Sequence, residues 1–476
     1  MAISYARSIP MRDGQAGGRL HGKTAILITM CLGVFLAQLD STVVYLGLKH
    51  IGDDLQAGVS QLQWVLDSYN LVYAMLLLTG GTLGDLYGRL RIFACGIALI
   101  IVGSLICAFA PNGAVLIAGR AVTGLGSALE VPTSLAILTV TFRDTAERGR
   151  ALGIWASCNG LAMATGPTIG GLLIDSTGWR SIFFLSVPVG LLALVLGYLR
   201  VPESRHPEGR HLDPVAQVLA IVAVGALSFV TIEGQHWGWT SPVILAMAAV
   251  AIAAAVAFVR FEKDRPGAMV PLDIFHNPAF NAALAVAGLM TFGMYAMLFL
   301  TPLYLQSVLG ASALVAAVEL LPMSIAFVVV SQCSGALMTR LGARVMLVGG
   351  MSFMGCGLLL LAAVVAAADL WTVEAALVII GVGLGLNTGP VNAVAVAAVP
   401  PARSGTASGL VNTARMVGAT MGIAVLGAIF AAHVHGEAPH GMLDGLRFAY
   451  LGGAIGELSG ALIALVFVRA NSNRAG

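Results

Sequence analysis

The sequence predicts an all-α polytopic membrane protein with fourteen spanning helices, and three observations support this prediction. The 476-residue chain is 58% hydrophobic and 10% charged, whereas a soluble domain is about half apolar and about a quarter charged. Apolar runs long enough to cross a bilayer recur along the whole chain. Arginine and lysine residues are concentrated in alternate loops.

The apolar runs give the positions of the helices, because a span needs about 20 mostly apolar residues. We place helices at residues 25–47, 62–82, 93–111, 113–140, 149–173, 179–199, 214–233, 241–260, 281–304, 311–336, 345–367, 372–398, 406–432 and 444–468. The pair at 214–233 and 241–260 is either spanning or re-entrant.

The distribution of Lys and Arg tests this helix count. With both termini in the cytoplasm, 20 of the 25 basic residues lie in cytoplasmic segments, three in outer loops and two inside helices. The outer three are Lys49, Arg180 and Arg447, and the two inside helices are Arg120 and Arg415. Such an excess is typical of cytoplasmic loops. Since the basic residues are dispersed over loops, the net charge of +2 indicates no nucleic-acid partner.

Residues 81–91 read Gly-x-Leu-Gly-Asp-x-x-Gly-Arg-x-Arg between two apolar runs, so we expect a short loop that reverses the chain. The glycine spacing allows close approach of another backbone. The acid can cap a helix N-terminus, and the arginines place the loop in the cytoplasm. An ordinary polar turn is the alternative. The gating residues expected in this loop are Gly81, Gly84, Asp85, Gly88, Arg89 and Arg91.

Residues 335–344 repeat part of this pattern 254 residues later, with Thr339 in place of Asp85. Two six-helix halves separated by a two-helix insert explain the offset. Such repeats are typical of alternating-access transporters, whose substrate site lies between the halves. The expected segments are a cytoplasmic tail (1–24), an N-terminal bundle (25–199), a linker with two inserted helices (200–280), a C-terminal bundle (281–468) and a second tail (469–476).

Five acidic residues lie more than a turn inside the predicted spans, where each is a functional candidate unless it has a partner or lies at a helix end. They are Asp40, Asp67, Glu130, Glu319 and Glu457. Apolar neighbours surround Glu130 and Glu319 for more than a turn each way, which favours function. Asp67 lies near the outer end of its helix, where water can reach it. For Glu457, among small residues, both roles stay open.

Burial raises the pKa of a carboxyl group, so an acid at this depth can exchange protons near neutral pH. A cationic substrate can displace the proton, which gives a physical route to proton–substrate antiport. Arg120 needs a carboxylate or carbonyl partner, and Asp40 is the expected one. That pair either tunes the proton affinity of the acid or has a purely structural role.

The predicted fifth helix carries Gly160 and then Gly166-Pro167-Thr168-Ile169-Gly170-Gly171. Gly166 and Gly170 form a small-xxx-small face for tight helix packing. Pro167 removes one backbone hydrogen bond and kinks the helix. Generic packing of a membrane helix is the alternative.

These motifs together resemble those of the major facilitator superfamily and, within it, the fourteen-helix drug:proton antiporter family. Further matches are the segment Leu39-Asp40-Ser41-Thr42-Val43-Val44, the segment Trp64-Val65-Leu66-Asp67-Ser68-Tyr69, and residues 403–409 with Asn412 and Arg415. Tyr45 and Lys49 stand where the family pattern has Asn and Pro, and Glu130 is outside that pattern. The resemblance extends from about residue 25 to 432.

The resemblance implies a major facilitator fold and proton-driven efflux of lipophilic, cationic or amphipathic drugs by alternating access. The helix-5 motif then packs the two halves together at their outer ends. It also implies a bacterial plasma-membrane protein with both termini in the cytoplasm, acting as a monomer among lipids, with no cofactor beyond the proton gradient. A dedicated exporter of one metabolite or self-made antibiotic is the alternative. A membrane-embedded enzyme or receptor would need a catalytic constellation or a signalling domain, and we identify neither.

Three other sequence patterns are not interpreted as nucleotide-binding, metal or disulfide sites. The string Gly17-Gly18-Arg19-Leu20-His21-Gly22-Lys23-Thr24 fits a phosphate-loop pattern, but no buried strand precedes it. His433, His435, Glu437 and His440 form a short tract for which a solvated loop is favoured over a metal site. The six cysteines include no Cys-x-x-Cys pair, so we expect neither a disulfide framework nor a metal centre.

Overall fold

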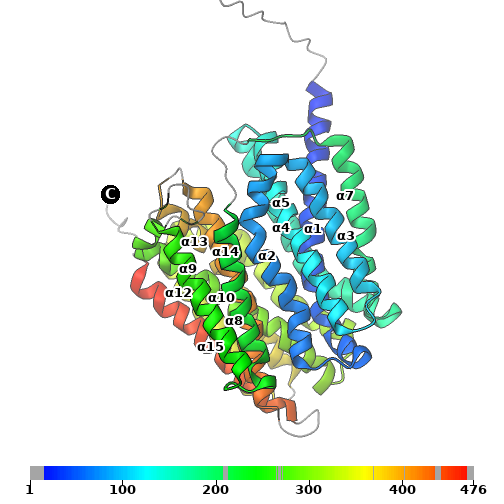
Figure 1. The fold of residues 1–476 in the computed structure, drawn as a ribbon, viewed down its shortest axis with the longest axis vertical. Coiled ribbons are helices and arrows are strands. Elements are labelled where there is room, and N and C mark those ends of the chain that lie inside the picture. Colours follow the sequence, from blue (N-terminus) through cyan, green and yellow to red (C-terminus); the bar gives the residue numbers. More distant parts are fainter. Residues whose placement is uncertain are drawn as a thin grey trace, which may run out of the picture.

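The computed structural model describes residues 16–206, 213–263, 265, 270, 272–367, 369–400, 403–434 and 441–468. Within these residues the chain is helical, with helices connected by short turns (Figure 1). The helices are α1 (Ala16–Leu55), α2 (Val59–Tyr87), α3 (Arg89–Ala108), α4 (Gly113–Thr141), α5 (Thr145–Thr177), α6 (Ser181–Phe184), α7 (Ser186–Arg200), α8 (Pro214–Trp237), α9 (Pro242–Glu262), η2 (Leu272–His276), α10 (Pro278–Leu303), η3 (Tyr304–Val308), α11 (Ala313–Leu341), α12 (Ala343–Val364), α13 (Leu370–Ala397), α14 (Ser404–Ala432) and α15 (Gly441–Phe467).

The helices form two groups that lie side by side. The first group contains α1 to α7, in which α3 and α2 pack on α4, and α5 and α7 pack on α1. The second group contains α10 to α15, in which α14 and α15 pack on α10, and α11 and α12 pack on α13. The groups meet mainly where α5 packs against α11 and α2 against α14 (Figure 1).

Every predicted span corresponds to a long helix except 179–199, which is divided at Leu185 into α6 and α7, and twelve segments of the described chain meet length and hydropathy criteria for a membrane span. The two long helices outside that set are α2 and α5, which carry more polar and charged residues. Several helices are longer than predicted, and α1 covers 16–55 instead of 25–47. Apolar runs mark only the part of a helix that lies in hydrocarbon, so the polar turns at the ends were missed.

Polar caps explain where several helices begin. The Asp144 carboxylate accepts hydrogen bonds from the backbone N–H groups of Ala146 and Glu147 at the start of α5. These bonds, the one from Glu147 above all, lower the pKa of Asp144. Asn112 and Ser312 cap α4 and α11 in the same way through their side chains.

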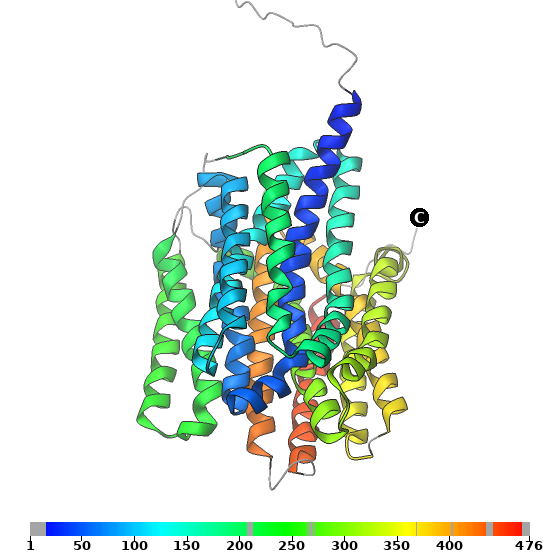
Figure 2. The ribbon, with the colours of Figure 1, turned by 90° about the vertical axis from the view of Figure 1, so that its right-hand side faces the viewer.

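The inserted pair α8 and α9 forms a hairpin at the edge of the bundle (Figure 2, green). Both helices have spanning length, which favours the spanning alternative. Gln217 of α8 donates to the carbonyl oxygen of Met75 and accepts from Thr79, both on α2. Near the other end of α8, Glu233 accepts a 2.9 Å hydrogen bond from the indole of Trp64. Since α8 also packs on α14, the insert covers the seam between the two groups.

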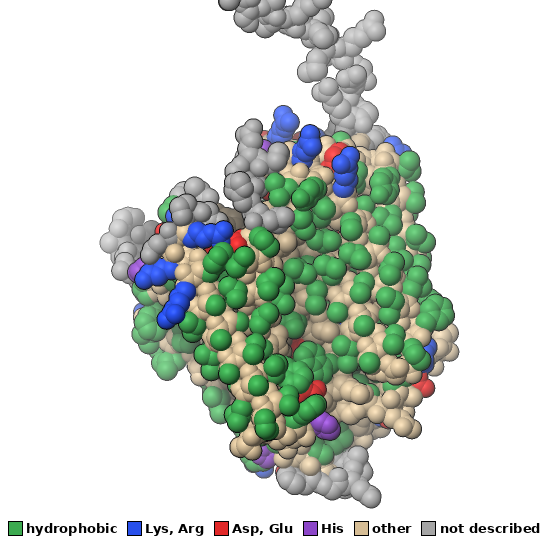
Figure 3. All heavy atoms as spheres, in the orientation of Figure 1, with side chains coloured by type: hydrophobic (Ala, Val, Ile, Leu, Met, Phe, Trp, Pro, Cys, Tyr) green, Lys and Arg blue, Asp and Glu red, His purple; other side chains and the backbone are tan. Residues whose placement is uncertain are grey.

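Most basic side chains gather at one end of the bundle, which we call the basic end (Figure 3). In the described residues it includes Lys23 at the start of α1 and Arg89 at the start of α3. Lys49, Arg180 and Arg447 lie toward the other end, which we call the opposite end. The basic residues are thus divided unequally between the two ends of the bundle, as their distribution in the sequence predicted.

The segment predicted as a gating loop is helical except at Gly88, so the loop prediction is wrong for residues 89–91, which begin α3, and for residues 81–87. They form the last turns of α2, and the chain turns at one residue, Gly88, whose φ of +116° favours glycine. Gly342, 254 residues later, has a φ of +84° between α11 and α12. Two single-residue turns at the predicted offset show that the repeat extends to the backbone.

Candidate functional site

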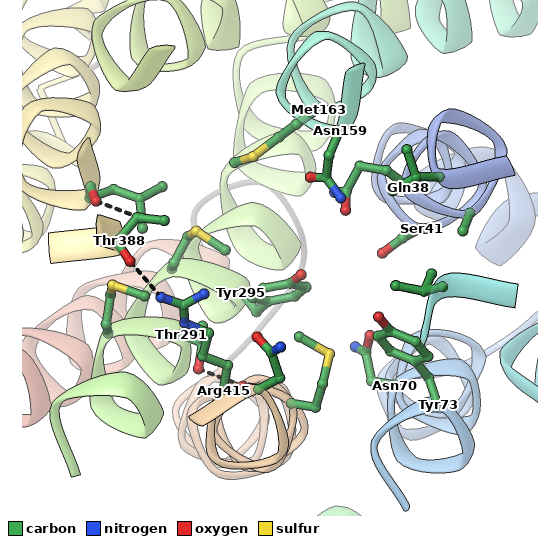
Figure 4. A pocket seen from close by; sticks show the side chains of 18 of the residues that line it. Gln38, Ser41, Asn70, Tyr73, Asn159, Met163, Thr291, Tyr295, Thr388 and Arg415 are labelled. Carbon is green, nitrogen blue, oxygen red and sulfur yellow. Dashed lines mark hydrogen bonds between the residues drawn. The ribbon is translucent and has the colours of Figure 1, made fainter. Parts of the chain in front are cut away.

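A cavity of about 200 Å³ lies between the two groups of helices (Figure 4). The first group contributes its lining from α1, α2, α4 and α5, and the second from α10, α11, α13 and α14. Polar lining residues of the first group are Gln38, Ser41, Asn70, Tyr73 and Asn159. Those of the second group are Thr291, Tyr295, Thr388, Asn412 and Arg415. Both groups therefore present hydrogen-bonding side chains to one space.

Flexible and aromatic side chains complete the cavity wall. The methionines of the lining are Met163, Met290, Met294 and Met416, and Phe327 adds an aromatic face. Methionine is unbranched and polarizable, so it adapts to ligands of different shape. A wall of this kind is typical of proteins that accept several ligands.

Asp40 and Arg120 form a buried ion pair behind this wall, as the sequence predicted. Arg120 Nη1 lies 2.6 Å from Asp40 Oδ2, and both side chains are 1% exposed. Arg120 Nε donates to the carbonyl oxygen of Val65 at 3.2 Å, and Ser104 Oγ lies 3.5 Å from Asp40 Oδ1. The charges compensate each other, which is what a carboxylate and a guanidinium at membrane depth require.

Tyr69 connects this pair to the cavity. Its ring lines the cavity and lies 4.5 Å from the Arg120 guanidinium carbon, in cation–π geometry. Its hydroxyl donates to the carbonyl oxygen of Ala37 and contacts Ser127 Oγ, both at 3.0 Å. A ligand that displaces the ring of Tyr69 would therefore also alter its contact with Arg120 in the ion pair.

In the described part of the chain three further acids are 0% exposed, and both carboxyl oxygens of each lack a hydrogen-bond partner: Asp67, Glu130 and Glu457. The interpretation of Asp67 as solvated is wrong, because its exposure is 0%; α2 begins eight residues before it and carries it below the surface. None of the three lines the cavity. An uncompensated charge is costly in such a place, so the protonated carboxyl is the cheaper form.

Two of these buried acids lie against glycines of neighbouring helices. The carboxyl of Glu130 on α4 lies against Gly33 of α1, close to where a β-carbon would be. Glu457 on α15 occupies the corresponding space beside Gly293 of α10. Each acid thus fills a gap that a small residue leaves in a helix–helix contact.

Glu319 lies apart from the cavity. Its side chain is partly exposed on α11, beside the carboxyl of Glu374 on α13. The apolar sequence around Glu319 did not reveal this second acid, because the two are 55 residues apart and meet only after α11 packs on α13.

The glycines of the α5 motif face two different helices. Gly166 packs on Thr42 and Gly170 on Val43, both of α1, in the small-xxx-small arrangement. Gly171 faces the other group, where a β-carbon would lie 2.7 Å from the carbonyl oxygen of Ala313. Gly160 has Val328 of α11 as its nearest neighbour, and Pro167 lies inside α5.

Hydrogen bonds between the two groups occur only toward the opposite end of the described chain. Asp175 of α5 accepts from the backbone N–H groups of Ala313 and Leu314, at 3.1 and 3.0 Å. Gln63 of α2 donates to the carbonyl oxygen of Ile423 at 2.8 Å. Gln306 donates to the carbonyl oxygen of Leu46 at 3.1 Å. The cavity is therefore sealed on that side.

At the basic end, the motif of residues 81–91 holds α2, α3 and the segment after α7 together. Asp85 accepts from Arg89 Nη2 at 2.7 Å, and the backbone N–H of His206 donates to the carbonyl oxygen of Asp85. The N-terminus of α3 is capped by Glu203, which accepts from Leu90 and Arg91 N–H. Among the glycines, Gly84 packs on Thr133 of α4, and Gly81 lies near Pro132.

Ser41, Tyr69, Asn412 and Arg415 entered the prediction only as members of family motifs without a role at the cavity, and the other neutral lining residues were missed. Asn70, Asn159 and Asn412 resemble ordinary polar interruptions of a membrane helix until the packing shows which face they occupy. For Arg415 a signal existed, because no acid lies within one turn of it on α14. Nothing in the sequence identified Thr388, whose carbonyl oxygen accepts from Arg415 Nη2 at 2.9 Å.

The patterns set aside in the sequence have ordinary surroundings. Residues 17–24 belong to α1 and do not form a phosphate loop. His433 stacks near Phe448, with ring centroids 4.3 Å apart; His435, Glu437 and His440 lie outside the described residues. All six cysteines are described, and all are free thiols.

Two groups of spanning helices that enclose a polar cavity, related by a sequence repeat and sealed together at one end, define a membrane transport protein. Comparison with known families agrees: the Major Facilitator Superfamily model matches residues 30–423. The chain belongs to the major facilitator superfamily, as its motifs predicted.

Curated relatives and one solved structure show the same relationship. The chain is 39% identical over 413 residues to multidrug resistance protein Stp of Mycobacterium tuberculosis, covering 85% of this chain and 75% of that protein. It is 33% identical over 453 residues to the methylenomycin A resistance protein of Bacillus subtilis, covering 95% and 96%. A bacterial homolog of the human lysosomal transporter Spinster, solved inward-facing and unoccupied, superposes with a TM-score of 0.69 at 16% identity, covering 93% of this chain and 96% of that chain.

Proposed function

We propose that this protein exports lipophilic, amphipathic small molecules across a bacterial plasma membrane by alternating access, driven by the proton gradient. The observation that carries the proposal is the cavity lined by both groups of helices and sealed toward the opposite end. Rocking of the groups about such a site exposes it to either side in turn. The relative named for multidrug resistance supports the drug class.

The proposed topology places the basic end in the cytoplasm, because positively charged residues stay on that side. The seal at the opposite end then faces outward, and the state described here takes up substrate from the cytoplasm or the inner leaflet. We propose that the two termini lie in the cytoplasm and that the protein acts as a monomer.

The proton is proposed to bind at the buried carboxyls next to the cavity. Asp67 lies one turn from the lining residue Asn70 on α2, and Glu130 lies next to the lining residue Val131 on α4. Both carboxyls are unpartnered, so protonation removes an uncompensated charge. The Asp40–Arg120 pair, in contact with Tyr69, is proposed to relay occupancy of the cavity to these acids.

Transport into inside-out vesicles tests the function. Drug uptake is expected when a proton gradient is applied, and a protonophore should abolish it. The change in bound protons on addition of drug to detergent-solubilised protein then locates the exchanging acid. This change is expected to disappear in Asp67→Asn or Glu130→Gln. A change that survives both substitutions but disappears in Glu319→Gln would place the site at the Glu319–Glu374 pair instead, and uptake unaffected by the protonophore would refute proton coupling.

A dedicated exporter of one metabolite or antibiotic is the second candidate. The observation that favours it is the relative named for methylenomycin A resistance, which matches nearly the whole length of both chains. A panel of unrelated toxic compounds, applied to cells with and without the protein, separates the two. Resistance to many scaffolds supports multidrug export, whereas resistance to a single scaffold supports the dedicated exporter.

Removing the carboxylate of Asp175 should weaken the seal at the opposite end. In Asp175→Ala, the N–H groups of Ala313 and Leu314 lose their acceptor, and a cap of this kind contributes about 1 kcal/mol. Spin labels at positions 53 and 371 report the distance between the groups at that end. We expect a larger fraction of long distances. Asp144→Ala, which removes a cap within one group, should leave the distribution unchanged; an identical shift in both variants would contradict the assignment.

A further inference from the structure

We propose that the cavity selects substrates that carry a negatively charged group, such as a carboxylate or an ionised phenol, and that Arg415 is the counter-ion for that group. This inference rests on the proposed export function and names its substrate class. It follows from the charge of the cavity wall, from the state of the Arg415 side chain, and from the absence of the described buried acids from the lining.

The wall of the cavity has a formal charge of +1. Among the described lining residues Arg415 is the one charged side chain, and no Asp, Glu or Lys contributes to the lining. The cationic preference expected from the sequence needed an acid at the substrate site. Without one, a cation in this space would meet only a like charge, and a low-dielectric site strengthens that repulsion.

Arg415 has no acidic partner in the described part of the chain. Its one side-chain hydrogen bond runs from Nη2 to the carbonyl oxygen of Thr388, and its Nε is buried without a partner. Arg120, the other intramembrane arginine, is fully paired with Asp40 at 2.6 Å. A guanidinium has five N–H donors, so Arg415 retains donors and a full positive charge that no protein group compensates.

The position of the guanidinium suits a ligand group. In Figure 4 it lies between Thr388 and the ring of Tyr295, at the wall of the cavity. Its backbone is held by Thr291, whose hydroxyl donates to the Arg415 carbonyl oxygen at 2.6 Å. A planar, positioned fork of donors is the arrangement that binds carboxylates and related anions.

The buried acids do not restore a cation site, because none of those in the described part of the chain lines the cavity. Asp40 is neutralised by Arg120. Glu130 points to Gly33, and Glu457 to Gly293. Asp67 is fully buried outside the lining. The acids thus remain available for protons while the cavity itself stays positive.

The rest of the wall defines the body of the ligand. Tyr69, Tyr73, Tyr295 and Phe327 provide aromatic faces, and the methionines adapt to its outline. Amides on both sides of the cavity offer donors and acceptors for neutral polar substituents. The preferred substrate is therefore an aromatic or polycyclic molecule with one acidic group placed near Arg415.

Binding to the full-length protein in lipid nanodiscs tests the proposal without a gradient. The probes are three naphthalene derivatives of similar size, namely the anion 1-naphthoate, the neutral alcohol 1-naphthalenemethanol and the cation 1-naphthylmethylammonium, together with the anionic dye fluorescein and the cationic dye rhodamine 123. Binding to empty nanodiscs is subtracted. We expect wild type to bind each anion about tenfold or more tightly than its cationic counterpart, as expected for a charge-assisted hydrogen bond.

Substitutions at position 415 separate recognition from structure. Arg415→Met should lose most of the anion affinity and keep the neutral probe, Arg415→Lys should retain part of the anion affinity, and Arg415→Glu should reverse the preference. Arg447→Met removes the same charge from an exposed position and should change nothing. Equal affinity for anions and cations in wild type, no anion binding at all, or equal loss of all probes in Arg415→Met would overturn the proposal. Anion binding with no gradient-driven uptake would instead refute the export function alone.

Discussion

Replacing Arg120 with glutamine is expected to destabilise the protein by about 3–5 kcal/mol, because it leaves a buried carboxylate without its counter-charge. Asp40 is 1% exposed and has its closest contact, 2.6 Å, with Arg120. The cation–π contact with Tyr69 is lost as well. A large fall in the unfolding temperature in detergent and a loss of transport should follow.

The double variant Asp40→Asn, Arg120→Gln provides the decisive comparison. With both charges removed, most of the stability should return, since neutral hydrogen-bonding groups replace the pair. Transport should stay low, because the charge that responds to Tyr69 is absent. Arg180→Gln is the control: its pair with Asp54 has partners 40% and 48% exposed, so the expected loss is under about 1 kcal/mol. A double variant no more stable than Arg120→Gln would mean that charge compensation is not the main role of the pair.

Gly171→Ala is expected to reduce transport about tenfold or more while the protein still folds. The added methyl group would lie 2.7 Å from the carbonyl oxygen of Ala313 and 2.7 Å from Leu314 Cα, and backbone atoms cannot move aside locally. The contact joins the two groups of helices and not the core of either one. The substitution therefore prevents the groups from closing at the opposite end and separates Asp175 from the N-terminus of α11.

Labelling of a cysteine introduced at Ser324 measures this opening. Ser324 is 3% exposed and lines a small apolar space beyond the main cavity, with Thr42, Tyr45 and Pro167. A membrane-impermeant thiol reagent should react with it faster in Gly171→Ala than in the parent. Gly149→Ala and Gly153→Ala are matched controls on the same helix, because a β-carbon at either position meets nothing within 4 Å. Slower transport in those controls, or unchanged labelling in Gly171→Ala, would contradict the proposed role.

The spanning helices could be predicted from the sequence because hydrophobic length is a local property. Ends were misplaced where helices continue into polar residues, as α2 does to Tyr87. The Asp40–Arg120 pair could be predicted because few charges exist at membrane depth and each requires a partner. The repeat at 81–91 and 335–344 could also be recognised from short segments of sequence, and it predicted that the chain consists of two related halves.

The position of a site between the halves could be predicted, but the lining of the cavity could not, because it depends on helix tilt and rotation. Gln38 and Asp40 are two residues apart, yet one lines the cavity and the other is sealed behind it with Arg120. Asn159 and Asn412 come from opposite halves and meet only through packing. The acids were chosen as candidate site residues because an intramembrane charge is a strong signal, whereas a neutral amide in an apolar run is not.

The unpaired arginine makes the response of this protein to membrane voltage depend on occupancy. An empty cavity has a lining charge of +1, which the proposed anionic substrate would cancel. Moving a unit charge across the whole membrane potential changes its electrostatic energy by about 2.3 kcal/mol per 100 mV. A charge near the midplane experiences only part of this potential difference when the cavity opens to one side or the other. With a negative cytoplasm, voltage favours the empty site facing inward and leaves the neutral, loaded site unaffected. The resting potential would thus reset the carrier after each release, and would not power the step that moves the substrate.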